Sequence, residues 1–109
     1  MIEIKIKPIS INACWQGRRF KTKKYSSWRE EFGYLVRGDW NKFSRPTQVR
    51  MEFYISNFAQ SDVDNMIKPT LDALQECGII ADDKYIVELY AKKFKVAKGK
   101  EKIICELKT

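Results

Sequence analysis

Histidine is absent from this chain of 109 residues, and cysteine is scarce. The missing imidazole excludes Ser-His-Asp and Cys-His catalysis, and it excludes any zinc site with a histidine ligand. The cysteines, Cys14, Cys77 and Cys105, are isolated in the sequence and form neither a disulfide framework nor a metal-spaced pair. Any catalysis by this chain must therefore use carboxylates, lysine, tyrosine or a metal ion.

Long apolar runs are missing as well. No stretch approaches the roughly 20 apolar residues of a membrane span, and no Pro/Gly/Ser-rich linker or internal repeat divides the chain. The first ten residues, "MIEIKIKPIS", alternate charge with isoleucine, which is typical of a strand rather than a signal peptide. We therefore expect one soluble, cytoplasmic domain over residues 1–109.

The first half of the chain contains two predicted strands and a helix between them. Alternating isoleucines predict a strand over residues 2–6, and a second alternation predicts a strand over residues 49–56. Between them, Ser27 and Glu30 have the spacing of a capping box, so we expect a helix to begin near Ser26 or Ser27. Residues 10–25 show no regular period and are predicted to be irregular.

The second half contains one predicted helix and two predicted strands. Apolar residues recur at helical spacing after Ile67, and Gly78 stands where a helix commonly ends. Pro69 disfavours the helical conformation of the residue before it, so this helix is expected to begin irregularly. The strand over residues 85–96 is expected to shift register near Lys92 and Lys93, with Val87, Leu89 and Ala91 on one face.

The resulting order is β-α-β-α-β-β. It predicts an α+β fold with a small mixed β-sheet, about two helices packed against it, and a C-terminal hairpin formed by the last two strands.

The charge of the chain is unevenly distributed. Residues 60–84 contain six acids and two lysines, a net charge of −4, whereas the whole chain carries +7. The rest of the chain therefore carries +11. Solubilising lysines would explain the total charge but not this segregation. A basic body around an acidic segment suits a protein that binds a polyanion and a cation.

The acids of this segment are candidate metal ligands. If Asp62 and Asp64 extend the preceding strand, their side chains point to one face, and a helix of about four turns can return Asp83 towards them. Converging carboxylates repel one another unless a divalent cation such as Mg²⁺ or Mn²⁺ binds between them. The alternative is a solvated turn with a helix N-cap at Asp62. An EF-hand is excluded, because it would need glycine and glutamate where the chain has Ile67 and Ala73.

Lys68 has two interpretations. It lies four residues after Asp64 and four before Asp72, so it could form ordinary ion pairs along a helix. Beside a metal ion, its ammonium could instead stabilise the negative charge that develops on a phosphate.

The segment "DVDNMIKPTLDAL" followed by "GIIADD" resembles the RusA family of endodeoxyribonucleases, the phage and prophage Holliday-junction resolvases. The early "SINACW" and the "KGK" turn are similar to the family more loosely. The resemblance implies that Asp62, Asp64 and Asp83 are metal-binding, catalytically required acids and that Lys68 is the essential lysine. It further implies supporting roles for Asn65, Asp72 and Asp82. Gln60 and Ser61 depart from the family, whose best-known member has arginines before the first aspartate.

Basic residues are candidates for contacts with DNA. Five of the seven residues from 18 to 24 are basic, and aromatic residues are interleaved with them. Such an arm can contact phosphates and stack on unpaired bases. The alternative is a solvated loop whose aromatic residues dock into the core. A second basic group lies in the C-terminal segment, and about half of it could face DNA. The candidate DNA-binding residues are Arg18, Arg19, Lys21, Lys23, Lys24 and Lys98.

The sequence and the resemblance together lead to the hypothesis of a Mg²⁺-dependent endodeoxyribonuclease that resolves four-way DNA junctions by paired nicks, in recombination and repair. Because a four-way junction is two-fold symmetric, the family's homodimer is expected. Two alternatives remain open: an inactive DNA-binding module that keeps the acids as structural residues, and a nuclease directed at flaps, forks or other branched DNA.

Overall fold

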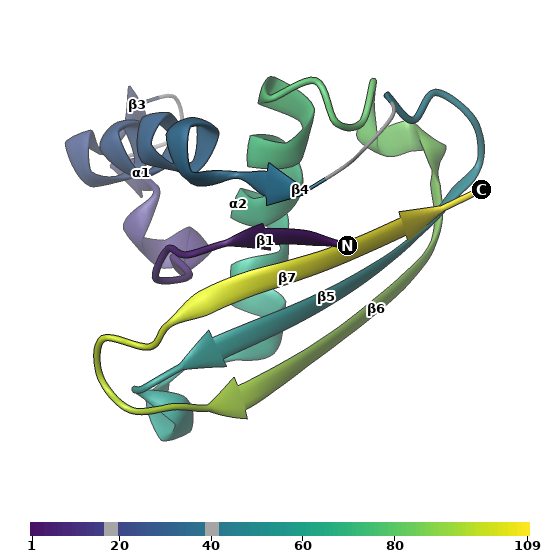
Figure 1. Cartoon of the computed structure of the whole chain (residues 1–109). Helices are drawn as coiled ribbons and strands as arrows, with labels where there is room; N and C mark the ends of the chain where they lie inside the picture. Colours follow the sequence, from purple (N-terminus) through teal and green to yellow (C-terminus); the bar gives the residue numbers. More distant parts are fainter. Residues whose placement is uncertain (17–19, 39–41) are drawn as a thin grey trace.

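The computed structural model describes residues 1–16, 20–38 and 42–109. A five-stranded mixed sheet has the strand order β4-β1-β7-β5-β6. In Figure 1, helix α2 crosses one face of this sheet. No helix of the described residues covers the opposite face of the sheet. The sheet strands are β1 (Ile2–Ile4), β4 (Arg37–Gly38), β5 (Thr47–Ile55), β6 (Ile86–Lys95) and β7 (Lys102–Lys108). The helices are α1 (Lys23–Leu35) and α2 (Val63–Glu76).

Short elements connect these pieces. The strands β2 (Trp15–Gln16) and β3 (Phe20–Lys21) pair with each other outside the main sheet. Three 3-10 turns complete the structure: η1 (Ile11–Ala13), η2 (Phe58–Gln60) and η3 (Asp83–Tyr85). The buried apolar residues form one core cluster. The predicted α+β domain is thus confirmed. Among the described residues, no helix is both long and apolar enough to cross a membrane.

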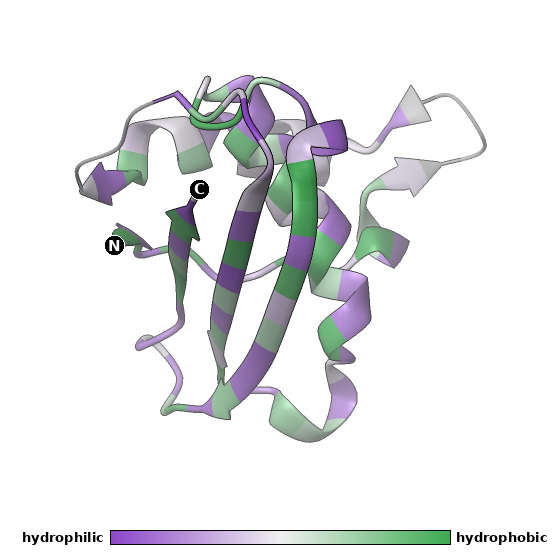
Figure 2. Cartoon of the chain, turned by 90° about the vertical axis from the view of Figure 1, so that its right-hand side faces the viewer, coloured by the Kyte–Doolittle hydropathy of each residue, from purple (hydrophilic) through white to green (hydrophobic). Residues whose placement is uncertain are grey.

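Strand β5 lies between β7 and β6 in the sheet, and its side chains alternate strictly between buried and accessible. Val49, Met51, Phe53 and Ile55 are buried, and the residues between them are not. Figure 2 shows the same alternation as stripes of hydropathy along the strands. β5 pairs with β6 in parallel and with β7 in antiparallel orientation. Helix α2 provides the crossover that two parallel neighbours require.

The predicted C-terminal hairpin is wrong. β6 and β7 follow each other in the chain, but they flank β5 on opposite edges and do not pair with each other. The turn between them crosses the end of β5, as Figure 1 shows. The alternation within β6 and β7 indicates strands but does not reveal their partners. β6 consequently forms the edge of the sheet, where exposed lysines such as Lys92 and Lys95 discourage pairing with another chain.

The register shift in β6 also differs from the prediction. Thr47 pairs with Ile86 and Gln48 with Glu88, so Val87 is the extra residue of a bulge at the start of the strand. From there the pairing is regular, and Lys93 lies opposite Phe53. Lys93 is therefore on the helix-covered face of the sheet, which the predicted shift near Lys92 and Lys93 did not indicate.

Helix α1 begins earlier than predicted. Its N-cap is Thr22, whose Oγ1 accepts the backbone N–H of Tyr25 at 3.1 Å and donates to the carbonyl of Ala13 at 2.6 Å. Ser26 and Ser27 lie inside the helix. The earlier start places Tyr25 within the first turn, where it is fully buried.

Helix α2 is regular from Val63 onwards and includes Pro69, so the predicted irregular start is wrong. Pro69 cannot donate the backbone bond to the carbonyl of Asn65, but the helix packs Met66, Leu71 and Leu74 into the core. Burial of this apolar face outweighs the lost bond. Gly78 has a φ of 79° just past the helix, which confirms the predicted glycine stop.

Candidate active site along helix α2

Asp62 and Asp64 stand at the start of helix α2, not on an extension of β5. Asp62 occupies the N-cap position, but its side chain makes no capping hydrogen bond. Among the described residues, its carboxylate accepts only a long contact from Asn65 Nδ2, at 3.5 Å. Asp64 lies exposed in the first turn. Asp62 therefore occupies the N-cap position that the alternative interpretation predicted, but its side chain does not cap the helix.

These two carboxylates are available for a ligand. Within the described residues, neither Asp62 nor Asp64 takes part in an ion pair. The positive end of the helix dipole favours negative charge at this position and offsets part of their mutual repulsion.

Lys68 joins the middle of α2 to the turn that follows the helix. Its Nζ lies 3.0 Å from Asp72 Oδ1 and 3.1 Å from Asp83 Oδ2. The hydrogen bonds to these two carboxylates raise the pKa of Lys68, and the bond to Asp72 has the larger effect. The hydrogen bond from Lys68 is also the main reason why the pKa of Asp83 lies below its usual value. Lys68 thus remains a cation and Asp83 an anion over the ordinary pH range.

Asp82 and Asp83 have different environments. Asp82 caps the 3-10 turn η3, because its Oδ1 accepts the backbone N–H of Lys84 at 3.0 Å. Asp83 follows directly and points its carboxylate to Lys68. Asp82 therefore shapes the turn that presents Asp83.

The acidic residues form two groups along α2. Asp62 and Asp64 lie at the helix start, while Asp72 and Asp83 hold Lys68 further along. In the part of the chain that is described, no three carboxylate or thiol groups lie close enough to share a metal ion. The expected meeting of Asp62, Asp64 and Asp83 is therefore not seen. As a donor set they are all carboxylate oxygens, the ligands that suit Mg²⁺ and Mn²⁺, and their roles as ligands stay predictions.

Lys93 is a residue of this site that the sequence did not reveal. Its ammonium donates to the carbonyls of Phe58 at 2.8 Å and Ser61 at 2.9 Å, and it lies 4.2 Å from the centre of the Phe58 ring. It thereby ties the segment immediately before Asp62 to the sheet. The sequence could have indicated Lys93 only as a lysine at an inward-facing position of β6, and that position is known only once the register of β6 is known.

The candidate DNA-binding residues are only partly described. Lys21, Lys23 and Lys24 are exposed at the start of α1 and before it, and Lys98 is exposed in the turn between β6 and β7. Lys21 lines a hollow of about 400 Å³ together with Arg29, Asp72, Gln75 and Glu76, so this basic segment adjoins the Lys68 group. Arg18 and Arg19 lie outside the described residues.

The aromatic residues of this segment belong mainly to the core. Tyr25 and Trp28 are buried, and the Trp28 indole donates to the carbonyl of Lys7 at 2.7 Å. Trp15 is partly exposed and packs against Tyr25, with 6.0 Å between the ring centres. For Tyr25 and Trp28 the structure supports the core alternative over base stacking.

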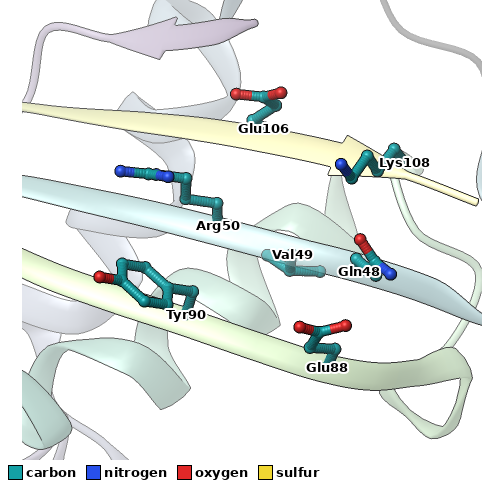
Figure 3. A pocket seen from close by; sticks show the side chains of 7 residues that line it. All are labelled: Gln48, Val49, Arg50, Glu88, Tyr90, Glu106 and Lys108. Carbon is teal, nitrogen blue, oxygen red and sulfur yellow. The ribbon is translucent and has the colours of Figure 1, made fainter.

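A further hollow of about 210 Å³ lies on the uncovered sheet face, away from the acids of α2. Figure 3 shows its side chains on β5, β6 and β7, with Arg50 and Tyr90 beside each other and Glu88 near the other end. None of the acids around α2 contributes to it. Its mixed charge and its position on the far face give it no part in the site.

Comparisons with known proteins bear on the site. A family model described as "Endodeoxyribonuclease RusA" matches residues 10–107. The chain is 29% identical over 94 residues to the crossover junction endodeoxyribonuclease RusA of Aquifex aeolicus, covering 84% of this chain and 74% of that protein. It is 26% identical over 86 residues to the crossover junction endodeoxyribonuclease of Enterobacteria phage 82, covering 77% of this chain and 72% of that protein.

The family model and these relatives identify the chain as a nuclease. The chain belongs to the RusA family of endodeoxyribonucleases. The resemblance carried by the "DVDNMIK" and "GIIADD" segments is thus confirmed, and both segments lie within the matched region.

Proposed function

We propose that this protein is a Mg²⁺-dependent endodeoxyribonuclease that resolves four-way DNA junctions by paired nicks, in DNA recombination and repair. The observation that carries the proposal is the pair of carboxylates at the start of α2, Asp62 and Asp64, which form no ion pair with a described residue, followed one turn later by the Lys68–Asp83 ion pair. The names of the relatives, which describe crossover junction endonucleases, support the choice of substrate.

In the proposed mechanism, Asp62, Asp64 and Asp83 would together hold Mg²⁺, with Mn²⁺ as an alternative, which requires these carboxylates to come closer than they lie in the described residues. The bound ion supplies a Lewis acid that activates water and neutralises the attacked phosphate. Lys68 donates hydrogen bonds to a phosphate oxygen as negative charge develops on it. Asp72 also contacts this ammonium, with its Oδ1 3.0 Å from Lys68 Nζ, and so helps to hold it in place.

The substrate also determines the expected assembly and setting. A four-way junction is two-fold symmetric and needs two nicks, so we propose a homodimer with one site in each subunit. DNA reaches the site from the basic segment, since Lys21 lines a hollow that Asp72 also lines. Because its substrate is chromosomal or phage DNA, we place the protein in the cytoplasm.

The deciding experiment compares wild type and Asp64→Asn on a synthetic four-way junction, a flap and a linear duplex of matched sequence. We expect wild type to cut the four-way junction in Mg²⁺, and we expect Asp64→Asn to lose at least about a hundredfold in rate while still binding in Ca²⁺. Glu106→Gln, which removes an exposed acid from the uncovered sheet face, is the matched control and should cut normally.

Cleavage that survives in Asp64→Asn, or a wild type that binds the junction without cutting any substrate, would contradict the proposal. A preference for the flap would keep the chemistry and replace the substrate. Titration of Mn²⁺ into the protein without DNA tests the ligands separately, since Asp64→Asn should bind the ion more weakly than Glu106→Gln.

A further inference from the structure

A buried polar contact between α1 and α2 ends on Lys68. Tyr25 is fully buried, and its hydroxyl donates to Asp72 Oδ2 at 3.4 Å. The other oxygen of the same carboxylate, Oδ1, contacts Lys68 Nζ at 3.0 Å. One carboxylate thus joins a core tyrosine of α1 to the candidate catalytic lysine of α2.

Arg29 sets the direction of this contact. It lies one helical turn after Tyr25, and its side chain is only 14% exposed. Its Nη1 donates to the Tyr25 oxygen at 3.4 Å, and its Nη2 donates to the backbone carbonyl of Asp72 at 3.3 Å. It also forms an ion pair with Glu76. Because the tyrosine oxygen accepts from Arg29, the hydroxyl proton is left to point at Asp72.

A buried polar contact of this kind costs more free energy than is needed merely to pack two helices together. Buried charges must be desolvated, and apolar residues of the same size would hold two helices together at least as well. Arg29 Nε is buried without a hydrogen-bond partner among the described residues, which adds to the cost. A role beyond holding α1 against α2 explains why the contacts of Tyr25, Arg29 and Asp72 extend to Lys68.

Lys68 is a side chain that needs such support. Its side chain is 53% exposed, and a lysine has four rotatable bonds, so an isolated ammonium would sample many positions. A group that stabilises a transition state must be held in place before the reaction begins. Asp72 supplies a fixed contact only if its own carboxylate is fixed.

We propose that Tyr25 and Arg29 are positioning residues: they orient the carboxylate of Asp72, which in turn holds the ammonium of Lys68 beside Asp83. The inference rests on the proposed function for the role of Lys68, but the geometry it concerns can be tested without cleavage.

The first test is Tyr25→Phe, which keeps the ring and removes only the hydroxyl. We expect the single-turnover cleavage rate of a four-way junction to fall about tenfold, while the Kd for the junction in Ca²⁺ and the melting temperature stay close to wild type. The matched control is Tyr54→Phe, because the Tyr54 hydroxyl also donates to a carboxylate, that of Glu52 at 2.9 Å, on the other face of the sheet. This control should cleave normally.

The second test measures Lys68 directly, by the NMR order parameter of its ammonium in the DNA-free protein. Tyr25→Phe should lower the order parameter, and Tyr54→Phe should leave it unchanged. In an Asp72→Ala background, which removes the acceptor of the Tyr25 hydroxyl, adding Tyr25→Phe should change neither the rate nor the order parameter further. If Tyr25→Phe proves unstable, Arg29→Lys gives the same reading, because a lysine there keeps a charge for Glu76 but cannot contact Tyr25 and Asp72 together.

The two tests separate the two proposals. A chain that cuts no DNA but loses order at Lys68 in Tyr25→Phe would refute the proposed function and retain the positioning role. An unchanged order parameter in Tyr25→Phe would overturn the positioning role, whatever happens to cleavage. A fall in melting temperature with Lys68 order unchanged would show that the contact only joins the helices.

Discussion

Lys68 and Asp83 are 15 positions apart in the chain, yet Lys68 Nζ lies 3.1 Å from Asp83 Oδ2. The ion pair connects the middle of α2 to the 3-10 turn that leads into β6. Among the described residues, this ion pair joins helix α2 to the turn that contains Asp83. Both the stability of the turn and the proposed chemistry of the site depend on the charge of these two groups.

The Lys68–Asp83 pair should make stability depend on acid pH. Lys68 lowers the pKa of Asp83 in the folded state, so the stabilisation is present above the unfolded-state pKa of about 4 and is lost as pH falls through the lower folded pKa. Because both side chains are about half exposed, the contribution is expected to be below about 1 kcal/mol. Urea denaturation of wild type and Asp83→Asn should therefore differ at pH 6 more than at about pH 2.

The double variant Lys68→Met/Asp83→Asn provides the control. If the ion pair is responsible, Lys68→Met should lower the free energy of unfolding less in the Asp83→Asn variant than in wild type. Equal urea midpoints for wild type and Asp83→Asn across the whole pH range would rule out a stabilising pair.

The sequence predicted the elements whose signal is local. β5 follows from the alternation of Val49 to Ile55, and the end of α2 follows from Gly78, whose positive φ few other residues adopt. Likewise, the spacing of "DVDNMIK" and "GIIADD" identified acids and a lysine that lie on helix α2 and in the turn that follows it. Such patterns depend only on near neighbours in the chain.

Features that depend on strand partners could not be predicted in this way. The alternation in β6 and β7 is the same whether they pair with each other or both with β5. The inward position of Lys93 follows from the bulge at Val87, which only the pairing reveals. Tyr25 and Arg29 are likewise invisible as site residues until α1 packs on α2. The acids of the candidate site could therefore be predicted from the sequence, but the residues that contact and orient them could not.

The cysteines should differ sharply in reactivity. Burial raises the pKa of Cys14 to about 11 and that of Cys105 to about 12, whereas Cys77 is half-buried with a raised pKa. Since the thiolate is the reactive form, a thiol reagent at neutral pH should label Cys77 first and the other two only on unfolding. Mass spectrometry of the native protein checks this, with Cys77→Ser as the control that should remove the early label. Early labelling of Cys14 or Cys105 would contradict the core packing.

Replacing a glycine by alanine should have opposite effects on stability at Gly33 and at Gly78. Gly33 lies inside α1, and a Cβ there would meet only Cys77 Sγ at 3.9 Å, an ordinary contact. Gly33→Ala should therefore stabilise the protein by up to about 1 kcal/mol through helix propensity. Gly78 has a φ of 79° with open space around it, so Gly78→Ala should destabilise by about 1 kcal/mol through backbone strain alone. Thermal or urea unfolding measures both, and shifts of the same sign would refute the assignment of one of the two conformations.

Lys93 should control the segment that precedes Asp62. Its ammonium donates to the carbonyls of Phe58 and Ser61, so Lys93→Met keeps the stem but leaves both carbonyls without their donor. We expect amide hydrogen exchange over residues 58–64 to accelerate about tenfold, because this segment would open locally without unfolding the sheet. The affinity for Mn²⁺ in the absence of DNA should fall with it, since residues that orient a metal ligand commonly alter affinity by about tenfold or more when removed.

The neighbouring lysine is the matched control for Lys93. Lys92 lies on the opposite face of β6, with its ammonium 5.0 Å from the centre of the Phe94 ring, so Lys92→Met removes the same charge from the same strand. If the loss of a positive charge near the site were the cause, both variants would weaken Mn²⁺ binding little or even strengthen it, because a cation repels a cation. Weaker binding in Lys93→Met alone, together with faster exchange over residues 58–64, can arise only from the contacts of Lys93 with Phe58 and Ser61. Equal behaviour of the two variants would show that the segment before Asp62 holds its shape without Lys93.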